Sequence, residues 1–229
     1  MDLGLKNKVI VITGDCRGMG EGIVRVLAGE GAIVAIVGRN QPENLKLQEE
    51  MEKTGSVAYT VTADLAEPAA CEKSINAIAQ KFGRIEGLVN NACVNEGVGW
   101  EAGRNERFME DLHNNLAHYY LMAHYTVPYL KKSKGAIVNI NSKTAETAEG
   151  NMSAYAAANG GRNALTREWA VELLKYDIRV NAVIVAGSNT PENRMTIPGE
   201  IAHVVAFLLS EKSSHTTGQL IHVGGDYLF

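Results

Sequence analysis

The sequence predicts a three-layer, doubly wound α/β fold with a mostly parallel sheet of about seven strands. Short apolar runs rich in Val, Ile and Ala alternate with helical stretches along the chain, and most of these runs are apolar on both strand faces. Such strands are buried on both sides, which is typical of a parallel sheet between two layers of helices. The composition does not shift along the chain, so we expect one domain over residues 1–229.

The first half of the chain supplies three strands and three helices. The predicted strands cover residues 8–14, 32–38 and 57–65. The predicted helices cover residues 21–31, 45–53 and 70–83. In the first helix the apolar residues recur at helical spacing, and Gly31 and Gly83 are placed to end their helices.

The second half continues the alternation. The predicted strands cover residues 85–92, 135–142, 178–185 and 219–225. The predicted helices lie near 106–131, 153–175 and 200–210. In such sheets ligands bind at the carboxyl ends of the strands, where the strand order reverses.

The composition excludes several function classes. The net charge is −4 and the basic residues are scattered, which disfavours a nucleic-acid binder. No apolar run reaches the ~18 residues of a membrane span, and the N-terminus does not resemble a secretory signal. The three cysteines have no metal-type spacing and the six histidines form no ligand pair, so we expect no metal and a reduced, cytoplasmic protein.

The turn after the first strand, TGDCRGMG at residues 13–20, is rich in glycine. Gly14, Gly18 and Gly20 allow the backbone to approach a pyrophosphate, which then lies on the N-terminus of the following helix. A tight turn between a strand and a helix also needs glycine, so a purely structural turn is the alternative. With the flanking strand and helix, the pattern favours a dinucleotide site of the Rossmann type.

The end of the second strand indicates which dinucleotide is preferred. An acidic residue there would bind the ribose 2′-hydroxyl of NAD, whereas an arginine accommodates the 2′-phosphate of NADP. This chain has Gly38 and Arg39 at that place, and Arg17 inside the glycine turn. The two arginines favour NADP(H), with NAD(H) as the alternative.

Several further motifs resemble those of the short-chain dehydrogenase/reductase family. They are the glycine turn, Asp64-Leu65, Asn90-Asn91-Ala92, Asn115-Leu116, Ser142, Tyr155 thirteen residues later, and RVNAV at 179–183. The likeness runs from about residue 6 to 225. It implies a single-domain NAD(P)-dependent oxidoreductase acting on CH–OH groups.

The resemblance implies four catalytic positions. The hydroxyls of Ser142 and Tyr155 would hold the substrate oxygen, with Tyr155 passing the proton, and Asn115 would hold a relay water. The family has a lysine four residues after the tyrosine, which binds the ribose and lowers the pKa of the tyrosine, but this chain has Asn159. We therefore expect weakened or alkaline-shifted activity, with Asn159 keeping only a ribose contact.

The resemblance also implies a cofactor site and a substrate site. The implied cofactor residues are Gly14, Arg17, Gly18, Met19, Gly20, Arg39, Asp64, Leu65, Asn91, Ala92, Tyr155, Asn159 and Thr190. Stretches such as 117–131 and 142–151 are similar to a branch of the family that contains L-fucose dehydrogenase. They place Asn95, Glu96, His118, Lys143, Glu146 and Asn151 at the border of a sugar pocket, although His118 can equally be a packed core residue.

Some positions depart from the family pattern. Cys93 replaces a glycine, and the segment near 190–199 is much shorter than the usual substrate lid. Two functions therefore remain open. One is an NADP(H)-dependent enzyme acting on a sugar or similar polyol, and the other is a nucleotide-binding protein that has lost its catalysis. The family resemblance also implies a homodimer or homotetramer, formed through the helices near 106–131 and 153–175.

Overall fold

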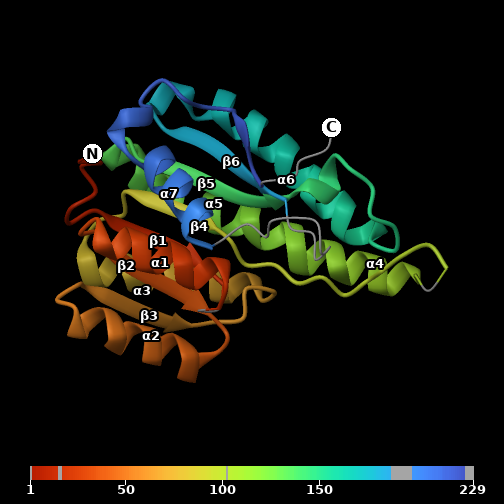
Figure 1. Ribbon diagram of the computed structural model, residues 1–229, viewed down its shortest axis with the longest axis horizontal. Coiled ribbons are helices and arrows are strands. Elements are labelled where there is room, and N and C mark those ends of the chain that lie inside the picture. The colour runs from red at the N-terminus through yellow and green to blue at the C-terminus, as the bar shows by residue number, and fades with distance from the viewer. Residues whose placement is uncertain (1, 15–16, 102, 187–197, 225–229) are drawn as a thin grey trace.

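The predicted fold class is confirmed. The computed structural model describes residues 2–14, 17–101, 103–186 and 198–224. One sheet of seven strands, in the order β3-β2-β1-β4-β5-β6-β7, lies between two layers of helices (Figure 1). Every neighbouring pair of these strands is parallel.

The strand order places the crevice of the sheet between β1 and β4. The strands are β1 Val9–Thr13, β2 Ile33–Gly38, β3 Ala58–Thr62, β4 Gly87–Asn90, β5 Ala136–Ser142, β6 Arg179–Val185 and β7 Leu220–Val223. From β1 the chain builds outward to β2 and β3, then returns to the other side of β1 with β4. The connections that follow β1 and β4 therefore run to opposite sides of the sheet, which opens a crevice at the carboxyl ends of these two strands.

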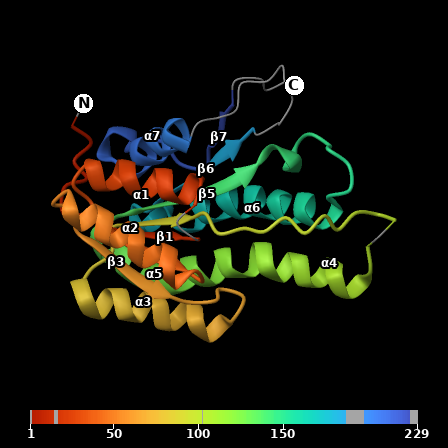
Figure 2. The ribbon, with the colours of Figure 1, turned by 60° about the horizontal axis from the view of Figure 1, so that its bottom comes forward.

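Helices cover both faces of the sheet, as Figure 2 shows. The helices are α1 Met19–Gly29, α2 Gln41–Lys53, α3 Pro68–Phe82, α4 Asn105–Leu112, α5 His118–Ser133, α6 Ser153–Glu172 and α7 Pro198–Leu209. Apolar residues of α1, α2 and α7 form one core with alternate strand residues such as Ile10 and Ile12. The intervening Val9 and Val11 pack with α3, α5 and α6 on the opposite face, because side chains alternate along a strand.

The long helix expected near 106–131 is interrupted. Residues His113–Ala117 form a π-helical turn between α4 and α5. Such a turn inserts an extra residue into the helix and is frequent at functional sites. Hydrophobic spacing did not reveal the interruption, because the residues buried around it, Asp111 and Asn115, are polar.

The helix α6 carries two consecutive glycines near its middle. A Cβ added at Gly161 would lie 3.0 Å from Cδ2 of Leu116, in the π-helical turn. A Cβ at Gly160 would meet no heavy atom within 4 Å. Gly161 therefore allows α6 to approach the π-helical turn, whereas Gly160 has no such packing role.

We expect Gly160→Ala to raise the free energy of unfolding by about 0.5–1 kcal/mol, because alanine is a better helix former than glycine. In a chain of this size the melting temperature should rise by roughly 2–4 °C per kcal/mol, measurable by calorimetry. Gly161→Ala is the matched control and should gain less, since Leu116 must move. Equal gains from both variants would contradict the packing role of Gly161.

Candidate active site

The crevice is held together by contacts between the ends of β1 and β4. The backbone N–H groups of Asn91 and Ala92 donate to Oγ1 of Thr13 over 2.9 and 3.2 Å, and Nδ2 of Asn91 donates to the Thr13 carbonyl over 2.9 Å. Gly14 follows with φ +109°, and a Cβ there would lie 2.7 Å from Nδ2 of Asn91. Glycine is therefore required where the chain leaves β1.

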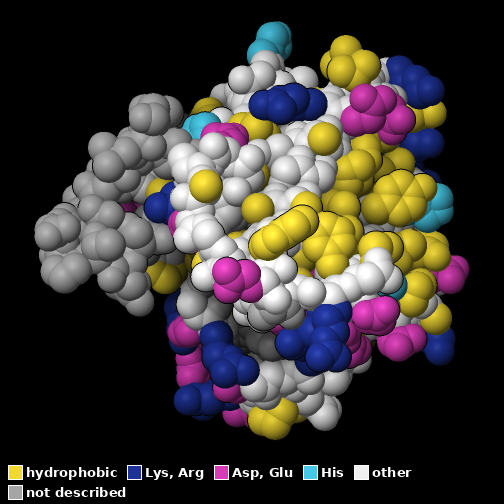
Figure 3. Space-filling view, turned by 90° about the vertical axis from the view of Figure 1, so that its right-hand side faces the viewer, with side chains coloured by type: hydrophobic (Ala, Val, Ile, Leu, Met, Phe, Trp, Pro, Cys, Tyr) yellow, Lys and Arg dark blue, Asp and Glu magenta, His cyan; other side chains and the backbone are white. Residues whose placement is uncertain are grey.

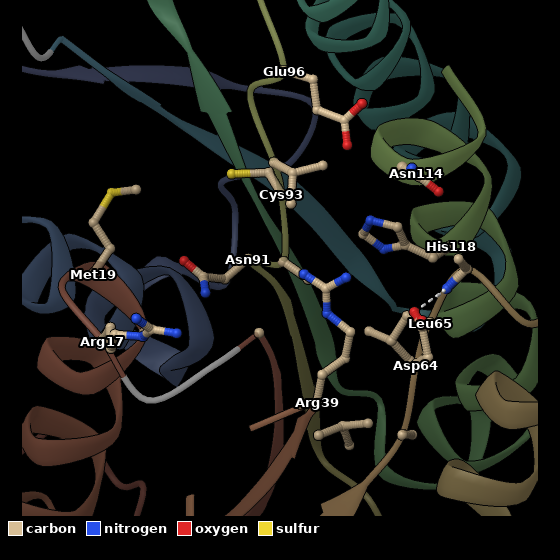
Figure 4. A pocket seen from close by; sticks show the side chains of 18 residues that line it. Arg17, Met19, Arg39, Asp64, Leu65, Asn91, Cys93, Glu96, Asn114 and His118 are labelled. Atoms are coloured by element: carbon tan, nitrogen blue, oxygen red, sulfur yellow. Dashed lines mark hydrogen bonds between the residues drawn. The ribbon is translucent and has the colours of Figure 1, made fainter. Parts of the chain in front are cut away.

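A cavity of about 450 Å³ opens at this crevice (Figure 4). Nine of the residues expected at the cofactor line it: Gly14, Arg17, Met19, Gly20, Arg39, Asp64, Leu65, Asn91 and Ala92. Gly18 is the N-cap of α1. Thr190 lies outside the described residues.

The polar groups of this cavity fit a dinucleotide phosphate. Gly18 has φ +53° and no side chain to cap α1, so the first N–H groups of this helix are available to an anion. Arg39 points into the cavity from the end of β2 (Figure 4). The Nε of Arg17 forms an ion pair with Oε2 of Glu43 over 2.8 Å.

A second cavity adjoins the first. Met19 and Cys93 line both cavities, which places them side by side. The second cavity contains Ser142 from the end of β5, Tyr155 from the first turn of α6, and Asn95. The structure thus brings the two expected catalytic hydroxyls to one cavity beside the dinucleotide crevice.

The Tyr155 hydroxyl lies near the thiol of Cys93, with Sγ 4.0 Å from the phenolic oxygen. Burial, with a contribution from Cys93, raises the pKa of Tyr155 to about 12, while the positive charge of Arg162 acts in the opposite direction. A phenol without a nearby ammonium group is therefore a weak base at neutral pH.

The Asn159 side chain is completely buried and hydrogen-bonded inside the protein. Its Nδ2 donates to the carbonyl of Tyr155 over 2.8 Å. Its Oδ1 accepts from the backbone N–H of Ser142 over 2.9 Å and from Nη1 of Arg162 over 3.1 Å. The amide thereby fastens α6 to the end of β5, and it does not line the dinucleotide cavity.

Asn115 occupies the π-helical turn and is equally engaged. Its Oδ1 accepts from the backbone N–H of Val94 over 2.9 Å, and its Nδ2 donates to Oδ1 of Asp111 over 2.9 Å. Its backbone carbonyl accepts from Nε of Arg162 over 2.7 Å. Burial raises the pKa of Asp111, and its hydrogen bond to Asn115 and the charge of Arg162 oppose that rise.

The residues expected to bind the substrate do not all line the same cavity. Asn95 lines the second cavity, whereas Glu96 and His118 line the first. Burial, with a smaller effect of Arg162, lowers the pKa of His118 to about 3, so its imidazole is neutral. Figure 4 shows that Glu96 comes from the loop after β4 and His118 from a helix.

The other three expected substrate residues line neither cavity. Lys143 forms an ion pair with Glu149 over 3.4 Å. Oε2 of Glu146 lies 2.8 Å from Nε2 of His222. Asn151 is exposed in a loop, with φ +53°.

Sequence reasoning left eight lining residues of the second cavity out of its site. They are Cys93, Ile140, Asn141, Thr144, Glu149, Met152, Arg162 and Val185. Thr144, Glu149 and Met152 lie in the irregular segment between β5 and α6, which carries no periodic signal. Arg162 lies three residues after Asn159, so its helical spacing was the available signal.

No group of three or more His, Cys, Asp or Glu residues in the described part of the chain is arranged to hold a metal ion. None of the described helices is long and apolar enough to cross a membrane.

Comparison with known proteins extends these observations. Residues 8–200 match the short chain dehydrogenase family. The 3-oxoacyl-[acyl-carrier-protein] reductase FabG of Thermotoga maritima is 32% identical, with 96% of this chain and 98% of the relative aligned. The L-fucose dehydrogenase of Bos taurus is 28% identical, with 95% of this chain and 88% of the relative aligned.

The solved structures agree. The crystal structure of Cj0485 dehydrogenase is 37% identical and superimposes with a TM-score of 0.91, covering 97% of this chain and 94% of the other. The match to the family covers most of the chain. The chain therefore belongs to the short-chain dehydrogenase/reductase family of NAD(P)-dependent oxidoreductases.

Proposed function

We propose that this protein transfers hydride between NADP(H) or NAD(H) and a hydroxyl or carbonyl group of a small, sugar-like substrate. The observation that carries the proposal is the meeting of Ser142 and Tyr155, from two different elements, in a cavity beside the dinucleotide crevice. A nicotinamide bound in that crevice would accept or supply the hydride.

The two hydroxyls divide the remaining work. Ser142 accepts a hydrogen bond from the backbone N–H of Thr144 over 3.3 Å, which orients its oxygen and leaves its O–H to bind the substrate oxygen. Tyr155 accepts the alcohol proton during oxidation and donates a proton during reduction. Such acid–base catalysis typically contributes about 10²–10⁴-fold to the rate.

The lining of the second cavity favours a hydroxylated substrate. Asn95, Asn141, Thr144 and Glu149 supply amide, hydroxyl and carboxylate groups around the reacting hydroxyls. These groups can hydrogen-bond to several substrate hydroxyls, which an apolar substrate would leave without partners. The name of the L-fucose dehydrogenase relative supports the same substrate class.

The uncharged Asn159 at the lysine position supports the expectation of a lowered activity. With a tyrosine pKa of about 12, roughly one molecule in 10⁵ carries the phenolate at pH 7. The replacement of the lysine by Asn159 also favours the second candidate, a nucleotide-binding protein without catalysis. The Asn159 amide is hydrogen-bonded to Ser142, Tyr155 and Arg162. The joint presence of Ser142 and Tyr155 in one cavity favours an enzyme over a nucleotide-binding protein without catalysis.

Several finer features accompany the proposal. Arg39 in the dinucleotide cavity supports a preference for NADP(H), while Glu43 reduces the charge that Arg17 offers. One domain spans residues 1–229. The shortened substrate lid expected near 190–199 lies largely outside the described residues. The cysteine content supports a cytoplasmic protein.

Exposed apolar side chains support a dimer or tetramer. Tyr120 of α5 is 51% exposed, and Val171 of α6 is 74% exposed. Further hydrophobic side chains gather on the face that carries the α4 end of the molecule, as Figure 3 shows. Burying such surface between subunits is favourable.

We expect the oxidation rate to rise about tenfold per pH unit between pH 7 and 10, because the phenolate fraction increases with pH below a pKa near 12. The reduction rate should stay nearly constant there, since the neutral phenol is the acid. Absorbance at 340 nm with NADP+ or NAD+ and a panel of aldoses, including L-fucose, provides the measurement.

Tyr155→Phe should lower kcat by about 10²–10⁴-fold without changing cofactor binding. Tyr125→Phe, on α5 and outside both cavities, is the control. A Tyr155→Phe variant as active as the unaltered protein would remove Tyr155 from the reaction.

We expect Arg39→Ala to weaken NADP+ binding by about 10- to 100-fold, the cost of one hydrogen-bonded ion pair with the 2′-phosphate. Binding of NAD+, which lacks that phosphate, should change little. Calorimetric titration of both dinucleotides measures the difference. Arg25→Ala is the control, because Arg25 is paired with Glu21 and Glu50 outside the cavity. Equal losses for NAD+ and NADP+ would show that Arg39 does not bind the 2′-phosphate.

A further inference from the structure

A guanidinium group lies buried beneath the candidate active site. Arg162 is 1% exposed and heads the largest fully buried side chains of the described residues. It projects from α6 one turn after Asn159, and it contributes to the lining of the second cavity. Burial of an arginine is costly unless its charge is well solvated by the protein, so the position calls for a reason.

The contacts of Arg162 connect four elements around the second cavity. Its Nε donates to the Asn115 carbonyl over 2.7 Å, and its Nη2 lies 3.3 Å from Oδ1 of the same residue. Its Nη1 donates to Oδ1 of Asn159 over 3.1 Å and to the carbonyl of Ile140 over 3.5 Å. The guanidinium carbon lies 4.1 Å from the centre of the Tyr119 ring. One side chain therefore joins the π-helical turn, β5, α5 and α6.

All of these partners are neutral. Among the described residues, no carboxylate lies within ion-pair distance of Arg162, and Asp111 reaches it only through the side chain of Asn115. The charge is therefore not cancelled by a direct partner, and its field extends to neighbouring groups. The titratable groups around it are Asp111 of α4, His118 and Tyr119 of α5, Tyr155 of α6 and Cys93 after β4.

We propose that Arg162 is a positioning residue. From its buried place on α6 it supplies the positive charge of this active site, in place of a cation at position 159. It acts by holding Asn115 and Asn159 and by stabilising negative charge on Tyr155 through space. The inference rests on the proposed oxidoreductase function and names the residue that allows this site to work with Asn159.

The charge of Arg162 cannot take part in proton exchange. A guanidinium remains protonated in proteins, so it cannot pass on a proton as an ammonium group can. Its Nε also occupies the Asn115 carbonyl, which otherwise offers an acceptor for a relay water. The proton accepted by Tyr155 therefore leaves through the second cavity, which Tyr155 lines.

The first test needs no turnover. A fluorotyrosine placed at position 155 in the full chain reports its own ionisation by ¹⁹F NMR, and the fluorine brings that ionisation to a lower pH. Arg162→Met should move the midpoint upward by roughly one pH unit, because a nearby positive charge is lost. Arg162→Lys keeps the charge and should move it less than half as far.

The matched control is Arg179→Met, which removes a half-buried guanidinium whose partners include the Leu208 and Ser210 carbonyls, away from both cavities. It should leave the midpoint in place. An unmoved midpoint in folded Arg162→Met, or an equal shift in Arg162→Lys, would overturn the electrostatic role. If Arg162→Met does not fold, the comparison of Arg162→Lys with Arg162→Gln decides in the same way.

The second test is kinetic. Arg162→Gln should lower kcat for oxidation at pH 8 by about tenfold, with little change in the KM for the dinucleotide, and Arg162→Lys should restore part of the loss. Asn159→Lys alone should not gain activity, because the ammonium would lie against the Arg162 guanidinium. Asn159→Lys combined with Arg162→Gln should regain the activity that Arg162→Gln loses.

The two tests separate two kinds of failure. If no alcohol is oxidised but the fluorotyrosine midpoint moves as expected, the proposed function fails and the role of Arg162 stands. If turnover is found but Arg162→Gln is as active as the unaltered protein across pH 7–10, the role of Arg162 is wrong. Full activity of Asn159→Lys with Arg162 in place would also contradict it.

Discussion

The hydrogen bonds that converge on the Asn159 amide hold the candidate active site together. Through this one side chain α6 is tied to the end of β5 and to the buried guanidinium of Arg162. Ser142 and Tyr155 lie on either side of this junction, so their mutual position depends on it. A polar network buried this deeply holds its shape only when its members are satisfied together.

This arrangement separates two tasks that one ammonium group can combine. Asn159 provides hydrogen bonds without charge, and Arg162 provides charge without proton exchange. The π-helical turn makes the division possible, because it presents the Asn115 carbonyl to Arg162 while the Asn115 side chain contacts Val94 and Asp111. Gly161 lets α6 approach that turn closely. The chemistry of the site is thus linked to a local irregularity in a neighbouring helix.

Much of the fold and half of the site could be predicted from sequence because their signals are local. Apolar runs between helical stretches determine a parallel sheet with two helical layers, since each strand must be covered on both faces. Gly14 and Gly20 follow from the turn that joins β1 to α1, and Ser142 and Tyr155 follow from motif spacing. The dinucleotide crevice follows in turn, because the order of the strands determines where it opens.

What remained depended on contacts between residues distant in sequence. No local pattern shows that Arg162 is buried against Asn115, 47 residues away, or that Glu146 lies beside His222 instead of lining a cavity. The break between α4 and α5 was likewise invisible, because the residues buried beside it, Asp111 and Asn115, are polar and carry no apolar periodicity. The sequence by itself determined the elements, their order and the presence of both hydroxyls. Only the tertiary structure decided which polar groups share the buried space beneath them, because burial and long-range hydrogen bonds arise when the elements pack.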